Sequence, residues 1–147
     1  VKEAQAAEVL INGGVDIITQ HTDSPAPLQT AGGKGILGFG QASDMIAFAP
    51  DTQLTSIMDY WGPYYVSRVK ALMNGTWESE DTWGGMNTGM VGMAPYTNMP
   101  DEVKKIAREI EIAILNGDLN IFEGISDDNG LLGMMNYLDG IDASVPN

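Results

Sequence analysis

The chain has 147 residues and a mass of 15.7 kDa, which suffices for one domain and is short for two. Hydrophobic residues make up 44% of it and charged residues 18%, a balance that excludes an intrinsically disordered chain. Seven basic residues stand against 20 acidic ones, and the net charge of -13 argues against nucleic acid or an anionic membrane surface as a partner.

The sequence lacks cysteine, a long apolar run and a visible signal peptide. It contains no cysteine, which excludes disulfides, thiolate metal ligands and cysteine nucleophiles. No apolar run approaches the roughly 18 residues that a membrane span requires, and no signal peptide is visible in a sequence that opens at Val1. We therefore expect no membrane-spanning helix, and we expect the chain to be a piece or a processed product of a longer one.

The first half of the chain alternates helical and strand patterns. Apolar residues recur on one helical face before Gly13, and β-branched residues follow it. Ser24 before Pro25 predicts an N-cap and the first turn of a short helix. The expected elements are a helix over residues 1–12, a strand over 15–20, a helix over 24–31, and strands over 36–39 and 54–58.

The second half contains the strongest helical pattern. Pro63 predicts the start of a helix that Gly75 ends, and a long loop follows to residue 89. The pattern over 100–117 predicts an amphipathic helix with a proline at its start and a glycine after its end. We also expect a short strand over 90–94, a turn at 127–130, and an apolar segment compatible with a helix at 131–138.

This alternation predicts an α/β fold, a mostly parallel sheet flanked by helices in a single domain. In such sheets, ligands bind beyond the carboxyl ends of the strands. That rule selects two loops rich in hydrogen-bonding side chains, residues 20–24 and 40–45. The sequence therefore predicts a polar ligand at the tips of these loops.

Two glycine-containing motifs are better explained by structure than by a cofactor or a metal. Residues 33–38 match the G-x-G-x-x-G letters, but they follow a helix and lead into a strand, the reverse of the dinucleotide-binding context. Residues 127–130 resemble the start of a calcium loop, but the twelfth position is Leu138 in place of a glutamate. We therefore expect no cofactor and no metal site.

Polar and aromatic loop residues have two interpretations each. His21 lies beside Asp23 and Ser24, but a catalytic triad needs residues that converge from separate segments, so a ligand-contacting or loop-structuring cluster is favoured. Trp61 and Trp83 lie in or near loops, where an indole either stacks on a planar ligand or covers an apolar seam.

The residues after the expected strands resemble those of a known family. The stretches are Gln20-His21-Thr22-Asp23-Ser24-Pro25, Gly40-Gln41-Ala42-Ser43-Asp44-Met45, Leu54-Thr55-Ser56, Trp61-Gly62-Pro63-Tyr64-Tyr65-Val66 and Asp81-Thr82-Trp83-Gly84-Gly85-Met86. They resemble the carboxy-terminal part of the basic membrane protein family, also called purine-nucleoside-receptor-like proteins. The resemblance runs over essentially all 147 residues.

This resemblance implies a type I periplasmic binding protein fold and a non-catalytic, substrate-binding component of an ABC importer. It implies a purine nucleoside or a related purine as the ligand, held between two lobes. It also implies an ABC permease as the partner of full-length relatives, and a periplasmic or cell-surface lipoprotein location. The family's sugar-contacting aspartate falls on Asp44, and its cleft-lining loop falls on Thr22 and Asp23. The candidate ligand-binding residues are therefore Asp44, Ser43, Asp23, Thr22, His21, Trp61 and Trp83.

Two departures from the family pattern change the expectation. Many relatives carry a lysine shortly after the Leu-Thr-Ser strand, where this chain has Asp59, so a free base such as adenine is as plausible as a nucleoside. Relatives are also much longer, and their first lobe lies upstream of the position of Val1. We therefore expect residues 1–147 to correspond to the carboxy-terminal lobe of a two-lobed protein, with the first lobe absent from this chain. We also expect this chain alone to bind a purine-type ligand weakly, because it supplies only one wall of the cleft.

Two functions compete. One is a solute-binding component, or its remnant, and the other is a self-associating structural α/β module that has lost ligand binding. An enzyme is disfavoured because no activated nucleophile, metal cluster or phosphate loop is found in the sequence. A homo-oligomer is expected, since without the first lobe the strand over 15–20 exposes an unpaired edge and the helix after Pro63 exposes an apolar face.

Overall fold

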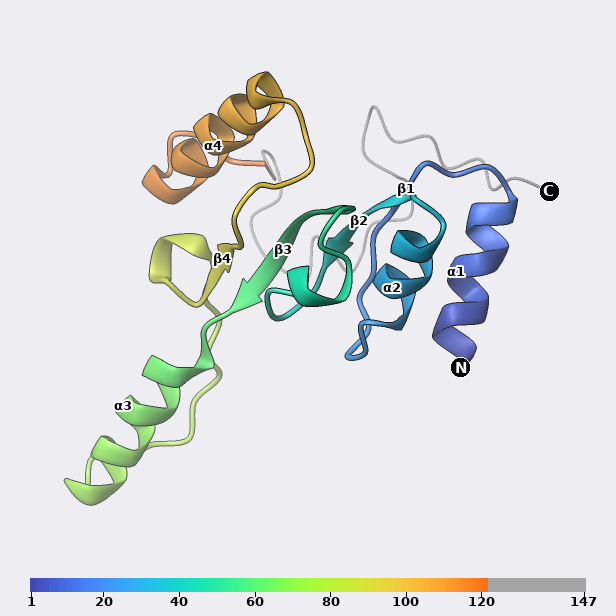
Figure 1. Cartoon of the computed structure of the whole chain (residues 1–147). Helices are drawn as coiled ribbons and strands as arrows, with labels where there is room; N and C mark the ends of the chain where they lie inside the picture. The colour runs from blue at the N-terminus through green and yellow to red at the C-terminus, as the bar shows by residue number, and fades with distance from the viewer. Residues whose placement is uncertain (122–147) are drawn as a thin grey trace, which may run out of the picture.

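A four-stranded sheet with helices on both faces forms the centre of the structure (Figure 1). The computed structural model describes residues 1–121, so the expected turn at 127–130 and the apolar segment at 131–138 lie outside the described residues. The elements in chain order are α1 (Lys2–Asn12), β1 (Ile17–Ile18), α2 (Ala26–Gly33), β2 (Leu37–Gly40), β3 (Gln53–Asp59), α3 (Trp61–Met73), β4 (Val91–Met93) and α4 (Asp101–Asn116), with short 3-10 helices at Ile46–Phe48 and Met86–Thr88.

The sheet is mixed. Its strand order is β1-β2-β3-β4, in which β1 pairs with β2 and β2 with β3 in parallel. β4 runs antiparallel to β3, so the expectation of a mostly parallel sheet holds for three of the four strands. The carboxyl ends of β1, β2 and β3 therefore meet at one edge of the sheet, and β1 forms an outer strand among the described residues.

One face of the sheet packs against α2, which itself packs against α1. Leu28 of α2 is fully buried and forms a cluster with Met45 and Ala49. A Cβ built on Gly38 of β2 would lie 2.6 Å from Leu28 Cδ1, so the close approach of the helix to the strand depends on glycine at this position. Because Met45 belongs to the cluster, the same packing anchors the loop that follows β2.

The other face of the sheet is apolar and is turned toward α4. Ile17, Leu37 and Phe39 of the strands line a cavity of about 350 Å³ together with Val103 and Ala107 of α4. α4 has no buried residue, yet its apolar face is turned to this cavity. The expected amphipathic helix over 100–117 is thus confirmed, with Gly117 after its end at a φ of 76°.

The expected cap of α2 is wrong. The helix begins at Ala26 with Pro25 at the N-cap position, and no side chain caps it. The Ser24 hydroxyl donates a hydrogen bond to the Glu3 carboxylate of α1, while the backbone N–H of Ala26 lies 3.4 Å from Ser24 Oγ. A carboxylate is a strong acceptor for a hydroxyl, so the Ser24 side chain connects its loop to α1 and does not cap the start of α2.

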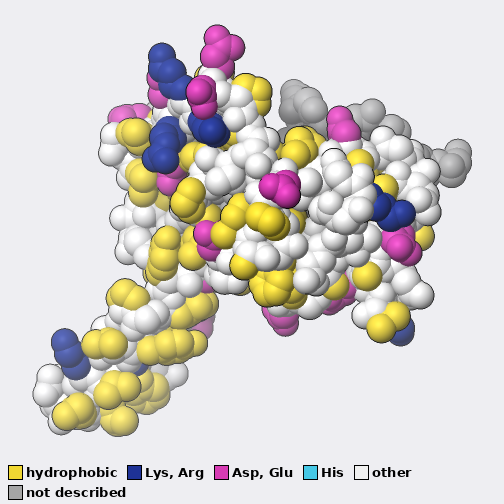
Figure 2. All heavy atoms as spheres, in the orientation of Figure 1, with side chains coloured by type: hydrophobic (Ala, Val, Ile, Leu, Met, Phe, Trp, Pro, Cys, Tyr) yellow, Lys and Arg dark blue, Asp and Glu magenta, His cyan; other side chains and the backbone are white. Residues whose placement is uncertain are grey.

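Residues 60–90 form an arm that projects from the sheet (Figures 1 and 2). β3 and β4 carry it, and the backbone N–H of Tyr60 donates to the carbonyl of Met90 at 2.8 Å. α3, the helix of this arm, begins at Trp61, two residues before the proline that was expected to start it. Proline is tolerated there because the N–H groups of a first turn have no intrahelical acceptor.

The α3 helix has no buried residue. Its apolar side chains are open to solvent, and Figure 2 shows hydrophobic side chains gathered on the arm. They include Val66, Val69, Leu72 and Met73, as the sequence pattern predicts for one face.

Candidate ligand-binding site

Three loops meet at the carboxyl ends of β1, β2 and β3. They are residues 19–25, residues 41–45 and the connection from Asp59 to Trp61. Gln20 joins the first two loops, because its Nε2 lies 3.3 Å from Ser24 O and 3.3 Å from Met45 Sδ. Its Oε1 accepts a hydrogen bond from the backbone N–H of Leu28 at 3.0 Å, which also fixes the start of α2.

Asp44 lies beyond the carboxyl end of β2, as predicted. Its Oδ1 accepts hydrogen bonds from the backbone N–H of Ile46 at 3.1 Å and from Gln53 Nε2 at 2.8 Å. Gln53 is buried at the start of β3, so the exposed Asp44 carboxylate is oriented by a rigid partner. Ser43 is held by its carbonyl, which accepts a hydrogen bond from Ser56 Oγ. Both candidate residues of this loop are thereby positioned, and the Ser43 and Asp44 side chains are open to solvent.

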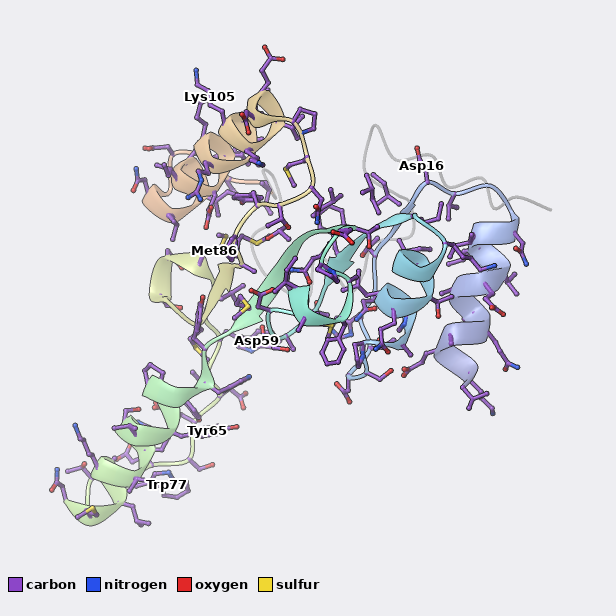
Figure 3. The ribbon with its side chains drawn as sticks, viewed as in Figure 1. Asp16, Asp59, Tyr65, Trp77, Met86 and Lys105 are labelled. Carbon is purple, nitrogen blue, oxygen red and sulfur yellow. The ribbon has the colours of Figure 1, made fainter. Side chains whose placement is uncertain are left out.

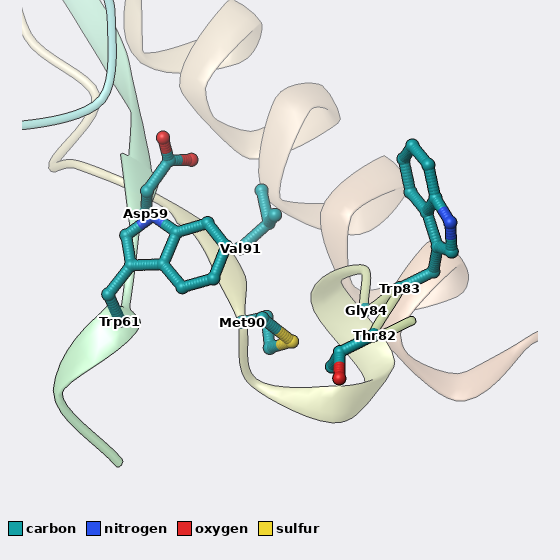
Figure 4. A pocket seen from close by; sticks show the side chains of 7 residues that line it. All are labelled: Asp59, Trp61, Thr82, Trp83, Gly84, Met90 and Val91. Atoms are coloured by element: carbon teal, nitrogen blue, oxygen red, sulfur yellow. The ribbon is translucent and has the colours of Figure 1, made fainter. Parts of the chain in front are cut away.

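The third connection forms a pocket of about 310 Å³, which we name the tryptophan pocket (Figure 4). Its lining residues are Asp59, Trp61, Thr82, Trp83, Gly84, Met90 and Val91. Asp59 ends β3, Trp61 begins α3, and Trp83 comes from the loop before β4. The backbone N–H of Asp59 donates to the carbonyl of Ala42 at 3.0 Å, which joins this pocket to the loop that carries Ser43 and Asp44.

Aromatic neighbours hold the indole of Trp61. The Tyr65 ring lies nearly parallel to it at a centroid distance of 5.9 Å, and the Tyr64 ring lies edge-on at 5.7 Å. Trp61 nevertheless remains 45% exposed and Trp83 83% exposed. Two indoles with large open surfaces thus border one pocket.

His21 and Thr22 lie in a different depression. With Glu3 and Leu10 of α1 they line a hollow of about 220 Å³ between α1 and the end of β1. The Thr22 hydroxyl donates to the carbonyl of Ser24 at 3.0 Å and so structures its own loop. Asp23 is exposed. The seven candidate residues therefore fall into three neighbouring groups at one edge of the sheet and do not line a single pocket.

Two further features of the described residues concern the chemistry of the site. No group of three or more His, Asp or Glu side chains in residues 1–121 is placed to hold a metal ion. Burial and the Glu111 carboxylate raise the pKa of Tyr96 to about 12. Tyr96 lies next to α4 and away from the three loops, and its hydroxyl donates to Glu111 at 3.2 Å.

Sequence reasoning missed Asp59 as a site residue. In the sequence, Asp59 is distinguished only by its position in place of a lysine, although it directly follows the strand expected over 54–58. The strand-end rule that selected the first two loops applies equally to this third parallel strand. Thr82 lies in one of the stretches that resemble the family, next to Trp83, and could have been found by that signal. Met90 carries no comparable signal, because the turn of the chain through the arm brings it to the pocket.

The structure is an α/β protein in which polar and aromatic side chains gather at the carboxyl ends of parallel strands, the position where such sheets bind ligands. The chain belongs to the PnrA-like family of ABC transporter substrate-binding proteins, whose sequence model matches residues 1–123. The predicted family and fold class are thus confirmed. The family is one of substrate-binding proteins and not of enzymes, in agreement with the expectation of no catalysis.

Two curated relatives match almost the whole chain. A purine-binding protein of Brucella abortus (strain 2308) is 54% identical over 160 residues, which cover 99% of this chain and 46% of that protein. A putative ABC transporter glucose-binding protein of Haloferax volcanii is 33% identical over 148 residues, which cover 97% of this chain and 38% of that protein. The chain therefore spans less than half the length of both relatives.

Solved structures share the fold at low sequence identity. A transcriptional activator of the comK gene from Bacillus halodurans matches 78% of this chain and 42% of its own, with a TM-score of 0.65 and 19% identity. An ABC transporter solute-binding protein from Aeropyrum pernix K1 matches 88% of this chain and 46% of its own, with a TM-score of 0.63 and 13% identity.

Proposed function

We propose that this chain is the ligand-binding carboxy-terminal lobe of a solute-binding component of an ABC importer, and that its ligand is a purine base or nucleoside. The observation that carries the proposal is the 54% identity, over nearly the whole chain, to a protein named for purine binding. The gathering of polar loops and exposed indoles at one edge of the sheet supports it, because a purine offers both hydrogen-bonding edges and a flat face.

In this proposal each of the three loops contributes to the ligand. Trp61 and Trp83 provide flat apolar surface, and Asp44 and Ser43 provide hydrogen-bonding groups from the neighbouring loop. Thr22, His21 and Asp23 lie further along the same edge, where they face the outer part of the ligand or a second lobe. The orientation of Asp44 by Gln53 and Ile46 supports a role in hydrogen bonding to ligand, since an acceptor held in place loses less entropy on binding.

A sugar is the competing ligand, because the Haloferax volcanii relative is named for glucose binding. A thermal-shift screen of adenine, hypoxanthine, adenosine, guanosine and glucose distinguishes the two, since a ligand that binds only the folded state raises the melting temperature. A rise with purines and none with glucose supports the proposal. A rise with glucose alone overturns the proposed ligand class.

Partner and location follow from the same proposal. We infer an ABC permease as the partner of the whole protein and an extracytoplasmic location, with a lipid anchor as in a cell-surface lipoprotein. No helix within residues 1–121 is long and apolar enough to cross a membrane. The coding sequence upstream of Val1 tests the two-lobed architecture, because it must encode a second α/β lobe.

Self-association is the second candidate function, and two surfaces favour it. The apolar face of α3 is exposed, and β1 is an outer strand of the sheet among the described residues. A second copy or a second lobe would each cover such surfaces, which have a tendency to pair. The oligomeric state of the chain, with and without purine, separates this function from ligand binding.

A further inference from the structure

We propose that Asp59, Trp61 and Trp83 form the base-recognition part of the site, and that they select a flat heterocycle that presents N–H donors and carries no negative charge. Adenine fits this class, and a phosphorylated nucleotide does not. The inference rests on the proposed function and goes further, because neither the family nor the relatives' names assign these residues or the charge of the ligand.

The first support is the shape of the tryptophan pocket. Trp61 lies on one side and Trp83 on the other, and the Met90 and Val91 side chains lie between them (Figure 4). A volume of about 310 Å³ is at the small end of ligand pockets, which range over roughly 300–1,000 Å³. The pocket is therefore suited to a single ring system and is small for a whole dinucleotide.

The second support is the rigidity of the first indole. Tyr64 and Tyr65 pack against Trp61 from the following turn of α3, and the Arg68 guanidinium lies 5.8 Å from the centre of the Tyr64 ring. A ring that is held before the ligand arrives loses little side-chain entropy on binding. Stacking on such a surface depends on the flat face of the ligand and tolerates different bases.

The third support is the charge of the pocket. Among the described residues that line the pocket, Asp59 is the only charged one, and none is a lysine or an arginine. An ionised carboxylate only accepts hydrogen bonds, so the ligand must supply the donor, as the amino and ring N–H groups of adenine do. A phosphate would meet the Asp59 charge without a cation to balance it, on a chain of net charge -13.

Asp59 also connects base recognition to the rest of the site. Its carboxylate lies beside the Trp61 indole at one end of the pocket (Figure 4). Its backbone N–H donates a hydrogen bond to the carbonyl oxygen of Ala42 at 3.0 Å. The loop with Ser43 and Asp44 therefore begins immediately beyond the pocket. A base in the tryptophan pocket leaves any attached sugar near that loop.

The test uses the 147-residue chain labelled with 5-fluorotryptophan, whose three tryptophans give three 19F signals. Adenine is titrated into the millimolar range, because the pocket is open to solvent. We expect the Trp61 and Trp83 signals to shift together, and the signal of Trp77, which lies along the arm and does not line the pocket (Figure 3), to stay in place. AMP at the same concentrations should leave all three signals in place. Adenine shifts that exclude Trp61 and Trp83, or AMP binding as tightly as adenine, overturn the inference.

The Asp59→Asn variant tests the carboxylate with little change of shape. We expect adenine affinity to fall about tenfold, the equivalent of about 1.4 kcal/mol, because the Asn carbonyl oxygen still accepts a hydrogen bond but carries no charge. Asp16→Asn is the matched control, because it removes the same charge from an exposed residue before β1, far from the pocket (Figure 3). The charge-reversed Asp59→Lys variant should lose adenine and gain AMP.

The outcomes separate this inference from the proposed function. Adenine binding that is equal in the parent chain, Asp59→Asn and Asp16→Asn leaves a purine-binding protein and overturns the role of Asp59. Failure of every purine and nucleoside to bind the parent chain overturns the proposed function and this inference with it. An unchanged Trp77 signal and far-UV circular dichroism spectrum show that each variant is folded.

Discussion

The contact between Gly38 and Leu28 supports the loops of the site, and enlarging Gly38 should destabilise the fold. Gly38 lies in β2, and Leu28 reaches it from α2. A methyl group added at Gly38 would stand 2.6 Å from Leu28 Cδ1 and 3.4 Å from the carbonyl oxygen of Ile18. The first distance is far below a carbon–carbon contact of about 3.5–4.0 Å, so Leu28 or the backbone must move.

The expected size follows from the packing. Because Leu28 is fully buried with Met45 and Ala49, it has little space to move into, and Gly38→Ala should cost about 1–3 kcal/mol of unfolding free energy. Leu28→Ala alone should cost about 2–5 kcal/mol, since it leaves a cavity. In the double variant the new methyl group occupies part of that cavity. The destabilisation of the double variant should then be about 1–2 kcal/mol smaller than the sum of the two single destabilisations.

Urea unfolding followed by far-UV circular dichroism measures these quantities, because all three tryptophans fall within residues 60–90, the arm, and would not report on this contact by fluorescence. Gly33→Ala is the matched control, as a Cβ built there meets nothing within 4 Å. We expect it to be neutral or to stabilise by up to about 1 kcal/mol. A Gly38→Ala variant as stable as the parent chain would refute the reasoning, and so would strict additivity in the double variant.

Three further predictions concern ligand binding, pH dependence and association. Asp44→Ala should weaken nucleoside binding by about 1.5–3 kcal/mol in calorimetry, the contribution of a charge-assisted hydrogen bond, and an unchanged affinity would contradict its role. Burial, and next the Glu111 carboxylate, raise the pKa of Tyr96 from 10.0 to about 12 in the folded chain. Above pH 10 the unfolded chain therefore loses this proton while the folded chain keeps it, and the free energy of unfolding falls as the pH rises toward 12. Tyr96→Phe should remove that part of the decline in urea midpoints, and an identical decline in both proteins would show that Tyr96 does not contribute. Light scattering at micromolar concentration should detect a dimer or a larger oligomer of the chain. The polar substitution Val69→Ser on the exposed face of α3 should shift the equilibrium toward the monomer. A folded monomer in the parent chain would refute self-association.

Local sequence signals were sufficient where neighbouring residues decide the structure. The apolar periodicity that ends at Gly117 predicted α4 to within a residue, because helical spacing and a glycine with positive φ depend on the chain itself. The strand over 54–58 and its place in an α/β sheet followed in the same way. The family-specific loops at Asp44 and Thr22 were also visible in the sequence, and the structure places both loops at the strand ends where such sheets bind ligands.

Contacts between distant residues decided the rest. The sequence of Val91–Met93 carries no sign of strand direction, and β4 is antiparallel because the arm returns it alongside β3. Ser24 follows the cap pattern, but Glu3 from α1 offers it a charged acceptor instead. The placement of Trp61 and Trp83 on opposite sides of one pocket likewise depends on the path of the arm. Each of these outcomes is set by interactions across more than 20 residues of chain, as between Ser24 and Glu3, and these lie beyond the reach of local propensity.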